Sequence, residues 1–360
     1  MMMTTRRTTT TATVIRHQRR RPFWEASVPI ATKRELRREI RKRRETDAEG
    51  ARQIRVALVP TMGALHEGHL SLIKAAAGKH SCVVVSIFVN PTQFGQAADY
   101  ERYPRDVEAD ARAAVAAGAD LVFAPTSEEM YPFAAPTVSI DPGAIARRWE
   151  GEQRPGHFGG VALIVTKLLA LVQPDTAYFG EKDWQQYRVV SDLVAALDIP
   201  TDIVVCPTVR AADGLALSSR NRFLTAQERA TAAAALSQLR SEAAAVARQA
   251  TARAGGMGVR LDLDDDDNDD DSLRPRRVEA RLTTYLRDAG LQPDYVAIVN
   301  PTTLEPAVDF KGDTRLLLAA RMGNSSVRLL DTLALTAGND EAAADPRVPT
   351  ALADDNGASR

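Results

Sequence analysis

The chain has 360 residues, of which 44% are hydrophobic and 26% are charged, and its formal net charge is −1. These ordinary values exclude wholesale disorder and argue against a nucleic-acid surface spread over the whole molecule. Two cysteines, Cys82 and Cys206, exclude a disulfide framework and a four-cysteine zinc site, and no apolar run is long enough to span a bilayer. We expect about two domains, with both cysteines as small core residues in a reducing compartment.

The charge is unevenly distributed. The first 52 residues contain 15 of the 46 basic residues but only 6 of the 47 acidic ones, so they carry +9 and the remainder carries −10. Residues 1–22 are rich in Thr and Arg and lack acids, which is typical of a disordered tail or of a mitochondrial transit peptide. Residues 32–46 predict a helix whose charged face is solvated. We therefore expect an N-terminal extension over 1–52 and a cytoplasmic protein, with mitochondrial import as the alternative.

From Arg55 short apolar strands alternate with helical segments. The run Cys82–Val89 is apolar apart from Ser86 and β-branched in its core, as in buried parallel strands. The alternation predicts an α/β fold with a Rossmann-like, doubly wound parallel sheet over residues 53–208. The expected strands are Val56–Pro60, Cys82–Val89, Leu121–Ala124, Thr176–Phe179 and Ile203–Cys206, and the expected helices are Gly68–Ala77, Arg105–Ala117, Val161–Val172 and Trp184–Leu197.

Residues 209–336 predict a smaller α+β domain. Thr225 and Glu228 form a capping box that opens a helix ending near Ala250. An Asp-rich insertion at about 255–275 holds eight Asp within residues 262–271. It lacks the Gly and Glu of a calcium loop at the required places, so we expect a solvated loop. The other expected elements are the helix Val278–Ala289 and the strands Tyr295–Val299, Arg315–Ala320 and Val327–Thr332, followed by a disordered tail at 337–360.

The segment PTMGALHEGH, residues 60–69, lies between a strand and a helix. His66 and His69 are three residues apart and so fall on one side of the helix N-terminus. That terminus offers free N–H groups and the positive end of the helix dipole, and Gly68 lets a ligand approach the backbone. The segment predicts a polyphosphate site with two histidine donors, the alternative being two surface histidines.

A second segment, FVNPTQFG at residues 88–95, places Asn90 and Gln93 at the carboxyl end of a parallel strand. Open α/β sheets bind their ligands at this edge, and amides can donate to a carboxylate or accept from an amine. The alternative is a polar turn. We favour a ligand contact for both side chains.

Two further segments carry cations. In FGEKDWQQ, residues 179–186, Lys182 would reach a phosphate and Asp183 a ribose hydroxyl or an amine, with Gln186 on the same side. In LALSSRN, residues 215–221, two hydroxyls and a guanidinium suit phosphate oxygens. A salt-bridged helix start and a hydrophilic linker are the respective alternatives. Neither a P-loop nor a dinucleotide-binding G-x-G-x-x-G is present.

Together, these four segments resemble those of the pantothenate synthetases, also called pantoate–β-alanine ligases, and RYPRD (102–106) and RPGHF (154–158) match the same pattern. The resemblance covers about Arg55 to Thr336. It implies membership of the H-x-G-H nucleotidyltransferase superfamily, a smaller C-terminal domain that closes over the site, and a homodimer. It further implies that ATP and Mg²⁺ activate pantoate as pantoyl adenylate with release of pyrophosphate. β-Alanine then attacks the acyl carbon to give pantothenate and AMP.

The resemblance also implies individual roles, with metal ligands left open. It makes His69 the proton donor, although stabilising charge on the departing pyrophosphate would suffice for both histidines. The other catalytic residues are His66, Lys182, Ser218, Ser219 and Arg220. The residues implied for ATP are Met62, Gly63, Ala64, Leu65, His66, Glu67, Gly68, His69, Gly180, Glu181, Lys182, Asp183, Val209, Leu217, Ser218, Ser219 and Arg220. Gln93 and Gln186 would bind pantoate, and Gln93 and Asn90 would bind β-alanine.

Two other hypotheses remain. A class I aminoacyl-tRNA synthetase shares the H-x-G-H helix, but the chain after Val209 leaves little room for a tRNA-binding module and contains the Asp run. A catalytically inactive nucleotide-binding scaffold would keep the fold, although every motif residue is present. We expect small-molecule substrates and neither nucleic acid nor a membrane as partner.

Overall fold

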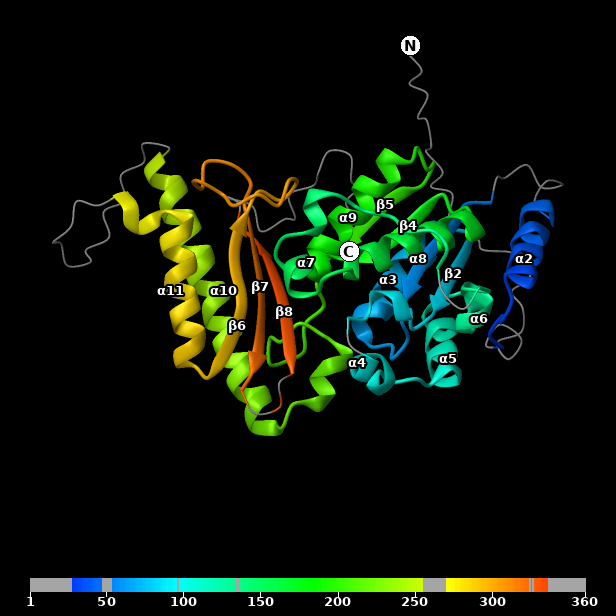
Figure 1. Ribbon diagram of the computed structural model, residues 1–360, viewed down its shortest axis with the longest axis horizontal. Coiled ribbons are helices and arrows are strands. Elements are labelled where there is room, and N and C mark those ends of the chain that lie inside the picture. The colour runs from blue at the N-terminus through cyan, green and yellow to red at the C-terminus, as the bar shows by residue number, and fades with distance from the viewer. Residues whose placement is uncertain are drawn as a thin grey trace, which may run out of the picture.

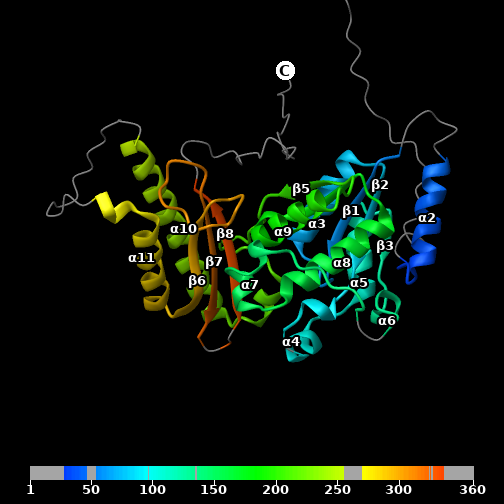
Figure 2. The same ribbon diagram turned by 45° about the horizontal axis from the view of Figure 1, so that its top comes forward.

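The computed structural model describes residues 28–46, 54–95, 97–133, 136–254, 270–323, 325 and 327–335. The Thr/Arg-rich start, the Asp-rich insertion through residue 269 and the C-terminal tail lie outside the described residues, and so do the predictions made for them. Figures 1 and 2 show two parts side by side, one around a parallel sheet and one around an antiparallel sheet. Among the described helices, none is long and apolar enough to cross a membrane.

The larger part is built on a five-stranded parallel sheet. Its strands are β1 (Val56–Thr61), β2 (Cys82–Ile87), β3 (Leu121–Phe123), β4 (Thr176–Gly180) and β5 (Asp202–Cys206), in the order β3-β2-β1-β4-β5. Each lies within two residues of its predicted bounds. The order reverses between β1 and β4, which is where doubly wound sheets place their ligands.

Helices cover both faces of this sheet. Successive strand residues point to opposite faces, so Leu58 packs in the apolar cluster that includes α8, while Val59 packs in the cluster that includes α3 and α5. This alternation explains why both faces of the strands are mostly apolar. The helices are α3 (Glu67–Lys79), α4 (Ala97–Arg102), α5 (Val107–Ala117), α6 (Ser127–Met130), α7 (Glu150–Gln153), α8 (His157–Val172) and α9 (Trp184–Ala196). The predicted doubly wound fold is confirmed.

Helix α2 (Lys33–Thr46) packs against the larger part rather than standing apart from it. Leu36 and Ile40 are buried in the cluster that contains α8. The charged face is solvated at Arg34, Arg37 and Arg38, as predicted, but Glu39 is only 3% exposed. The prediction is therefore wrong for Glu39, because this side chain lies beside the apolar stripe of the helix.

The smaller part is a three-stranded antiparallel sheet with helices on one face (Figure 1). Its strands, in the order β6-β7-β8, are β6 (Leu291–Val299), β7 (Arg315–Met322) and β8 (Arg328–Ala334), and its helices are α10 (Ala226–Ala254) and α11 (Pro275–Asp288). The predicted capping box is present, since Glu228 N donates to Thr225 Oγ1 at 3.2 Å and Thr225 N donates to Glu228 Oε2 at 2.9 Å. Strand β6 begins four residues earlier than predicted because Leu291–Pro293 pair with β7 before an irregularity in the ladder.

Two indole N–H groups join the parts. Trp149 Nε1 donates to the carbonyl of Leu304, and Trp184 Nε1 donates to that of Pro301, both at 2.9 Å. Arg315 of β7 lies over the Trp184 ring, 3.6 Å from its centroid. These contacts set the free face of the antiparallel sheet against α7 and α9. The domain boundary near residue 209 stays a prediction.

Candidate active site

A cavity of about 250 Å³ lies where the carboxyl edge of the parallel sheet faces the antiparallel sheet. Its walls come from the strand ends of β1 and β4, the start of α3, residues 207–220 and the strands β7 and β8. Most of the predicted site residues line it. They are Met62, His66, Gly68, His69, Asn90, Gln93, Gly180, Lys182, Asp183, Gln186, Val209, Leu217, Ser218, Ser219 and Arg220.

Three residues predicted at the ATP site, Gly63, Ala64 and Leu65, shape the turn before α3 and do not line the cavity. Gly63 has φ +82°, and a Cβ there would lie 2.8 Å from Asp110 Oδ2. The buried Asp110 carboxylate accepts the N–H groups of Ala64 at 2.7 Å and Leu65 at 2.8 Å. Sequence reasoning missed Asp110. The sequence did contain a signal for it, namely an acidic residue four positions before Ala114, on the face of helix α5 that is buried.

The two histidines meet at the start of α3, as predicted. His66 is the N-cap, its ring centroid lies 4.1 Å from that of His69, and its backbone N–H points to His69 Nδ1 at 3.4 Å. A Cβ on Gly68 would lie 2.9 Å from the His66 ring, so the glycine lets this ring fold back over the helix. Glu67, also predicted for ATP, is exposed and faces Lys74 at 3.3 Å.

Both histidines are neutral at neutral pH. Burial, followed by the nearby Lys182 charge, lowers the pKa of His66 to about 4. Burial, followed by the effects of His66 and Lys182, lowers the pKa of His69 to about 3. Each ring therefore carries one N–H donor and one acceptor nitrogen. His66 Nδ1 is a buried atom without a hydrogen-bond partner among the described residues, so a ligand can bond to it only if the ring turns.

Asn90 and Gln93 lie on the loop after β2, with Gln93 in the 3-10 helix Pro91–Gln93. The Asn90 amide nitrogen donates to Gln93 Oε1 and to the carbonyl of Gly160, both at 3.1 Å. Its oxygen accepts the Tyr131 hydroxyl at 2.8 Å. Asn90 is thus committed to intramolecular bonds that orient Gln93. By contrast, the Gln93 amide nitrogen contacts only Met62 Sδ, at 2.9 Å, a weak acceptor that a ligand can replace.

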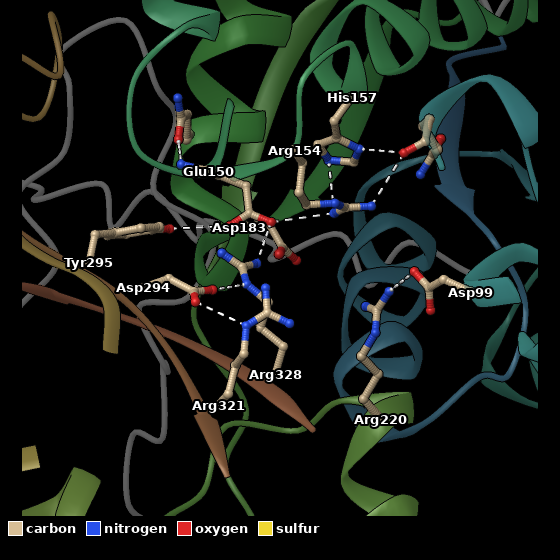
Figure 3. Close-up of polar contacts among 12 residues, drawn as sticks. Asp99, Glu150, Arg154, His157, Asp183, Arg220, Asp294, Tyr295, Arg321 and Arg328 are labelled. Atoms are coloured by element: carbon tan, nitrogen blue, oxygen red, sulfur yellow. Dashed lines mark hydrogen bonds and ion pairs between the residues drawn. The ribbon is translucent and has the colours of Figure 1, made fainter. Parts of the chain in front are cut away.

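Arg154, directly after α7, and His157 of α8 point toward each other (Figure 3), and both hold the backbone of Gln93. His157 Nδ1 donates to the Gln93 carbonyl at 2.9 Å, and Arg154 Nη2 donates to the same oxygen at 3.3 Å. Burial and Arg154 lower the pKa of His157 to about 4, which keeps His157 neutral, with Nε2 accepting from Arg154 Nη1 at 3.3 Å. The segment RPGHF was matched in the sequence, but these roles were not foreseen.

Lys182, Asp183 and Gln186 follow β4 and line the same cavity, with Lys182 close enough to act on both histidines. Lys182 Nζ lies 3.9 Å from Asp183 Oδ1, and its side chain is 17% exposed. Gln186 lines the cavity, and its amide makes no hydrogen bond within the described residues. Glu181, predicted for ATP, turns away, since it accepts from Arg315 Nη1 at 2.8 Å and from the Thr208 N–H at 3.3 Å.

The loop 209–220 closes the cavity from the side of the smaller part. Leu217 N donates to the Val209 carbonyl at 3.0 Å, and Ser218 Oγ accepts from Arg220 N at 3.2 Å. Arg220 Nη2 reaches across to Asp99 Oδ2 of α4 at 3.1 Å (Figure 3). The guanidinium predicted for phosphate is therefore ion-paired in this structure.

A helix N-terminus, two neutral histidines and a lysine at the carboxyl edge of a parallel sheet define a nucleotide-binding α/β enzyme. The family model described as pantoate-beta-alanine ligase matches residues 29–334, and the chain belongs to this family. A pantothenate synthetase of Rhizorhabdus wittichii is 46% identical over 302 residues, covering 84% of this chain and 96% of the relative.

Solved structures agree with this match. Pantothenate synthetase from Thermus thermophilus aligns with a TM-score of 0.69 at 40% identity, over 86% of this chain and 99% of that one. Pantoate-beta-alanine ligase from Francisella tularensis, complexed with beta-gamma ATP and beta-alanine, aligns with a TM-score of 0.64 at 32% identity, over 86% and 98%.

Family membership confirms the ligase activity and the fold that the sequence resemblance implied. It excludes the aminoacyl-tRNA synthetase hypothesis. The match begins at residue 29 rather than near Arg55, so it includes α2, which the resemblance had left outside. The packing of Leu36 and Ile40 explains why this helix belongs to the fold.

Proposed function

We propose that this one cavity carries out both half-reactions of pantothenate formation. In the first, the carboxylate of pantoate attacks the α-phosphorus of ATP, and pyrophosphate leaves. In the second, the amine of β-alanine attacks the acyl carbon of pantoyl adenylate, and AMP leaves. The observation that carries the proposal is that the phosphate-binding groups His66, His69 and Lys182 share a cavity with the amides of Gln93 and Gln186.

In the first half-reaction negative charge grows on the departing pyrophosphate. His66, His69, Lys182 and the N-terminus of α3 offer preorganised donors for it, which is the form of stabilisation that contributes most at such sites. Because both rings are neutral in the free protein, they act as hydrogen-bond donors. Proton donation by His69 requires that the bound phosphates first raise its pKa.

The groups of the loop 209–220 act on the same charge. Ser218, Ser219 and Arg220 would close on the triphosphate, with Arg220 exchanging Asp99 for phosphate oxygens. Gly180 and Asp183 would contact the nucleotide, and Val209 would pack near the adenine.

In the second half-reaction the mixed anhydride must be kept from water. Gln93 and Gln186 would hold pantoate, and Gln93 would also contact β-alanine. Asn90 was predicted to bind β-alanine directly, but its amide is fully used inside the protein. We assign it the role of orienting Gln93 instead.

Mg²⁺ fits this site as a companion of the triphosphate. Within the described residues no three His, Cys, Asp or Glu side chains gather into a group that could hold a metal ion. Magnesium at nucleotide sites typically takes one or two carboxylates plus phosphates and water. Asp183 is the suitable carboxylate, because it is 48% exposed and lies 3.9 Å from Lys182 Nζ, whereas Glu150 and Asp331 are buried and lie 2.6 and 2.8 Å from arginines. The ion would neutralise charge on the phosphates.

We propose a homodimer whose interface includes Phe133 and Val138. These two large apolar side chains are 73% and 63% exposed and lie five positions apart in the sequence, between α6 and α7. Sedimentation equilibrium of the wild type should give twice the chain mass, and Phe133→Ser should shift the equilibrium toward monomer. A wild-type protein that stays monomeric at all concentrations rejects the proposal.

We place the protein in the cytoplasm. Cys82 and Cys206 are buried free thiols, and burial raises their pKa values to about 12 and about 11, so neither is poised to form a disulfide. Imaging residues 1–52 fused to a fluorescent protein in a eukaryotic cell tests the alternative. Accumulation in mitochondria would overturn the cytoplasmic assignment.

The decisive experiment measures pyrophosphate release from ATP and Mg²⁺, with and without pantoate, before β-alanine is added. Release that requires pantoate, followed by AMP and pantothenate once β-alanine enters, is the expected result. Release that depends on another carboxylic acid would change the substrate. Measurable ATP binding without release for any acid would favour the non-catalytic scaffold.

A further inference from the structure

An ion-pair network connects the antiparallel sheet to the backbone of Gln93. The residues that the sheet contributes to this network, Arg328 and Asp294, lie outside the sequence motifs that predicted the site. We propose that Arg328 of β8, anchored by Asp294 of β6, is a positioning residue for Gln93, acting through Glu150 and Arg154. The proposal rests on the role assigned to Gln93 above. It makes the binding of pantoate depend on the position of the smaller part relative to the larger one.

The first link consists of the two ion pairs of Arg328 (Figure 3). Its Nε lies 2.5 Å from Asp294 Oδ2, and its Nη1 lies 2.6 Å from Glu150 Oε1. The side chains of Arg328, Asp294 and Glu150 are 11%, 12% and 7% exposed, so solvent screens these contacts weakly. Tyr295 adds a hydroxyl to Glu150 Oε2 at 3.3 Å. Glu150 is thus held from the antiparallel sheet although it belongs to α7.

The second link runs from Glu150 to Gln93. The oxygen that pairs with Arg328, Glu150 Oε1, also accepts from Arg154 Nη1 at 3.3 Å. Arg154 in turn donates to His157 Nε2 and to the Gln93 carbonyl, each at 3.3 Å. Because one carboxylate oxygen serves both arginines, the place of Arg328 determines where Arg154 lies. Losing Arg154 would leave the Gln93 carbonyl to His157 alone.

The network does not bond directly to His66, His69 or Lys182, although Glu150 and Arg154 line the same cavity. No contact between Arg328, Asp294, Glu150 or Arg154 and the side chains of His66, His69 or Lys182 is present among the hydrogen bonds and ion pairs of the described residues. Removing the Arg328 charge should therefore weaken binding of the acid substrate and spare that of ATP. A purely structural role would change both, or neither.

The test compares Arg328→Met with a matched control on the same sheet. Arg321 Nε also pairs with Asp294, at 3.0 Å, but Arg321 is 42% exposed and does not touch Glu150. We expect R328M to raise the KM for pantoate about tenfold and to leave the KM for ATP within about threefold, a size consistent with measured couplings. Arg328→Lys should recover most of the loss, and Arg321→Met should match the wild type. Equal KM changes for both substrates, or none, would overturn the proposal.

R328M leaves Glu150 buried without its main partner and could unfold the protein. The double variant Arg328→Met with Glu150→Gln removes both charges, so the test can be made even if R328M alone unfolds. Circular dichroism checks that each variant is folded. If Arg328 acts through Glu150, the double variant shifts the pantoate KM no more than Glu150→Gln alone. Additive shifts would contradict the chain of contacts.

Gln93→Ala, measured in parallel, separates this inference from the function on which it rests. An unchanged pantoate KM in Gln93→Ala means that the role assigned to Gln93 has failed, and the inference fails with it. A raised KM in Gln93→Ala, together with an unchanged KM in R328M, means that the positioning inference alone has failed.

Discussion

Burial and the neighbouring Lys182 cation keep His66 and His69 uncharged in the free protein, with pKa values of about 4 and about 3. A neutral imidazole can donate one hydrogen bond but brings no positive charge to the phosphates. Lys182 and the helix dipole then supply the positive potential at this wall. At the residue scale, different groups therefore supply hydrogen-bond donation and positive charge: the two histidines donate, and Lys182 and the helix dipole carry the charge.

This separation predicts different results for two kinds of substitution. His66→Ala, His69→Ala and Lys182→Ala should each lower kcat/KM by at least about 100-fold, because each removes a preorganised donor. His69→Gln keeps a neutral N–H donor and should retain more activity than His69→Ala. Steady-state kinetics of pyrophosphate release provides the measurement.

Lys74→Ala on the exposed face of α3 is the control and should match the wild type. An alanine variant within about tenfold of wild type would remove that residue from the catalytic set. Equal losses in His69→Gln and His69→Ala would favour proton donation over neutral hydrogen bonding.

At the scale of elements, the site depends on how closely α8 approaches the 3-10 helix that carries Gln93. A Cβ on Gly160 would lie 2.4 Å from the Thr92 carbonyl oxygen and 2.7 Å from the Gln93 nitrogen. These atoms are backbone, so they cannot swing aside as a side chain does. The absence of a side chain at Gly160 therefore sets the position of Gln93.

Gly160→Ala should displace the Gln93 segment and raise the KM for pantoate at least about tenfold. It should also lower the free energy of unfolding by about 1–3 kcal/mol, the usual cost of overpacking. Gly159→Ala is the matched control, because its Cβ would meet only the Ile140 carbonyl, at 3.2 Å. Kinetics and urea unfolding of both variants provide the comparison. A pantoate KM in Gly160→Ala equal to that in Gly159→Ala would show that the close approach is unimportant.

For the whole molecule, the histidines make stability depend on pH. Burial is the largest cause that lowers the pKa of each histidine in the described structure, and these are His66, His69, His80 and His157. In the unfolded chain they titrate near pH 6.5. As the pH falls below about 6.5, the unfolded state therefore binds more protons than the folded state, and the free energy of unfolding decreases.

We expect the free energy of unfolding to be lower at pH about 5 than at pH about 7 and to fall further toward pH about 4. Carboxylates with lowered pKa, such as Glu228, contribute mainly below about pH 5, so the upper part of this window belongs to the histidines. Urea unfolding at both pH values, with proton uptake measured on unfolding, tests this. Equal stability at pH about 7 and pH about 5 would contradict the burial of these rings.

The sequence by itself determined the elements and most of the cavity. Apolar runs, capping residues and glycines act within a few residues of one another, so strands such as Cys82–Ile87 and the paired rings of His66 and His69 follow from local pattern. The order and specificity of the motif segments also indicated the family.

Only the tertiary structure decided which side chains meet across long separations. Asp110 caps the turn before α3 from 45 or 46 residues away, and Arg328 reaches Glu150 across 178 residues. It also decided that Glu181 faces Arg315 and not the cavity. Such pairings depend on how layers pack, and burial then sets their strength, because removing solvent strengthens a paired charge and penalises an unpaired one. No pattern of neighbouring residues in the chain indicates which residues far apart in the sequence will come into contact.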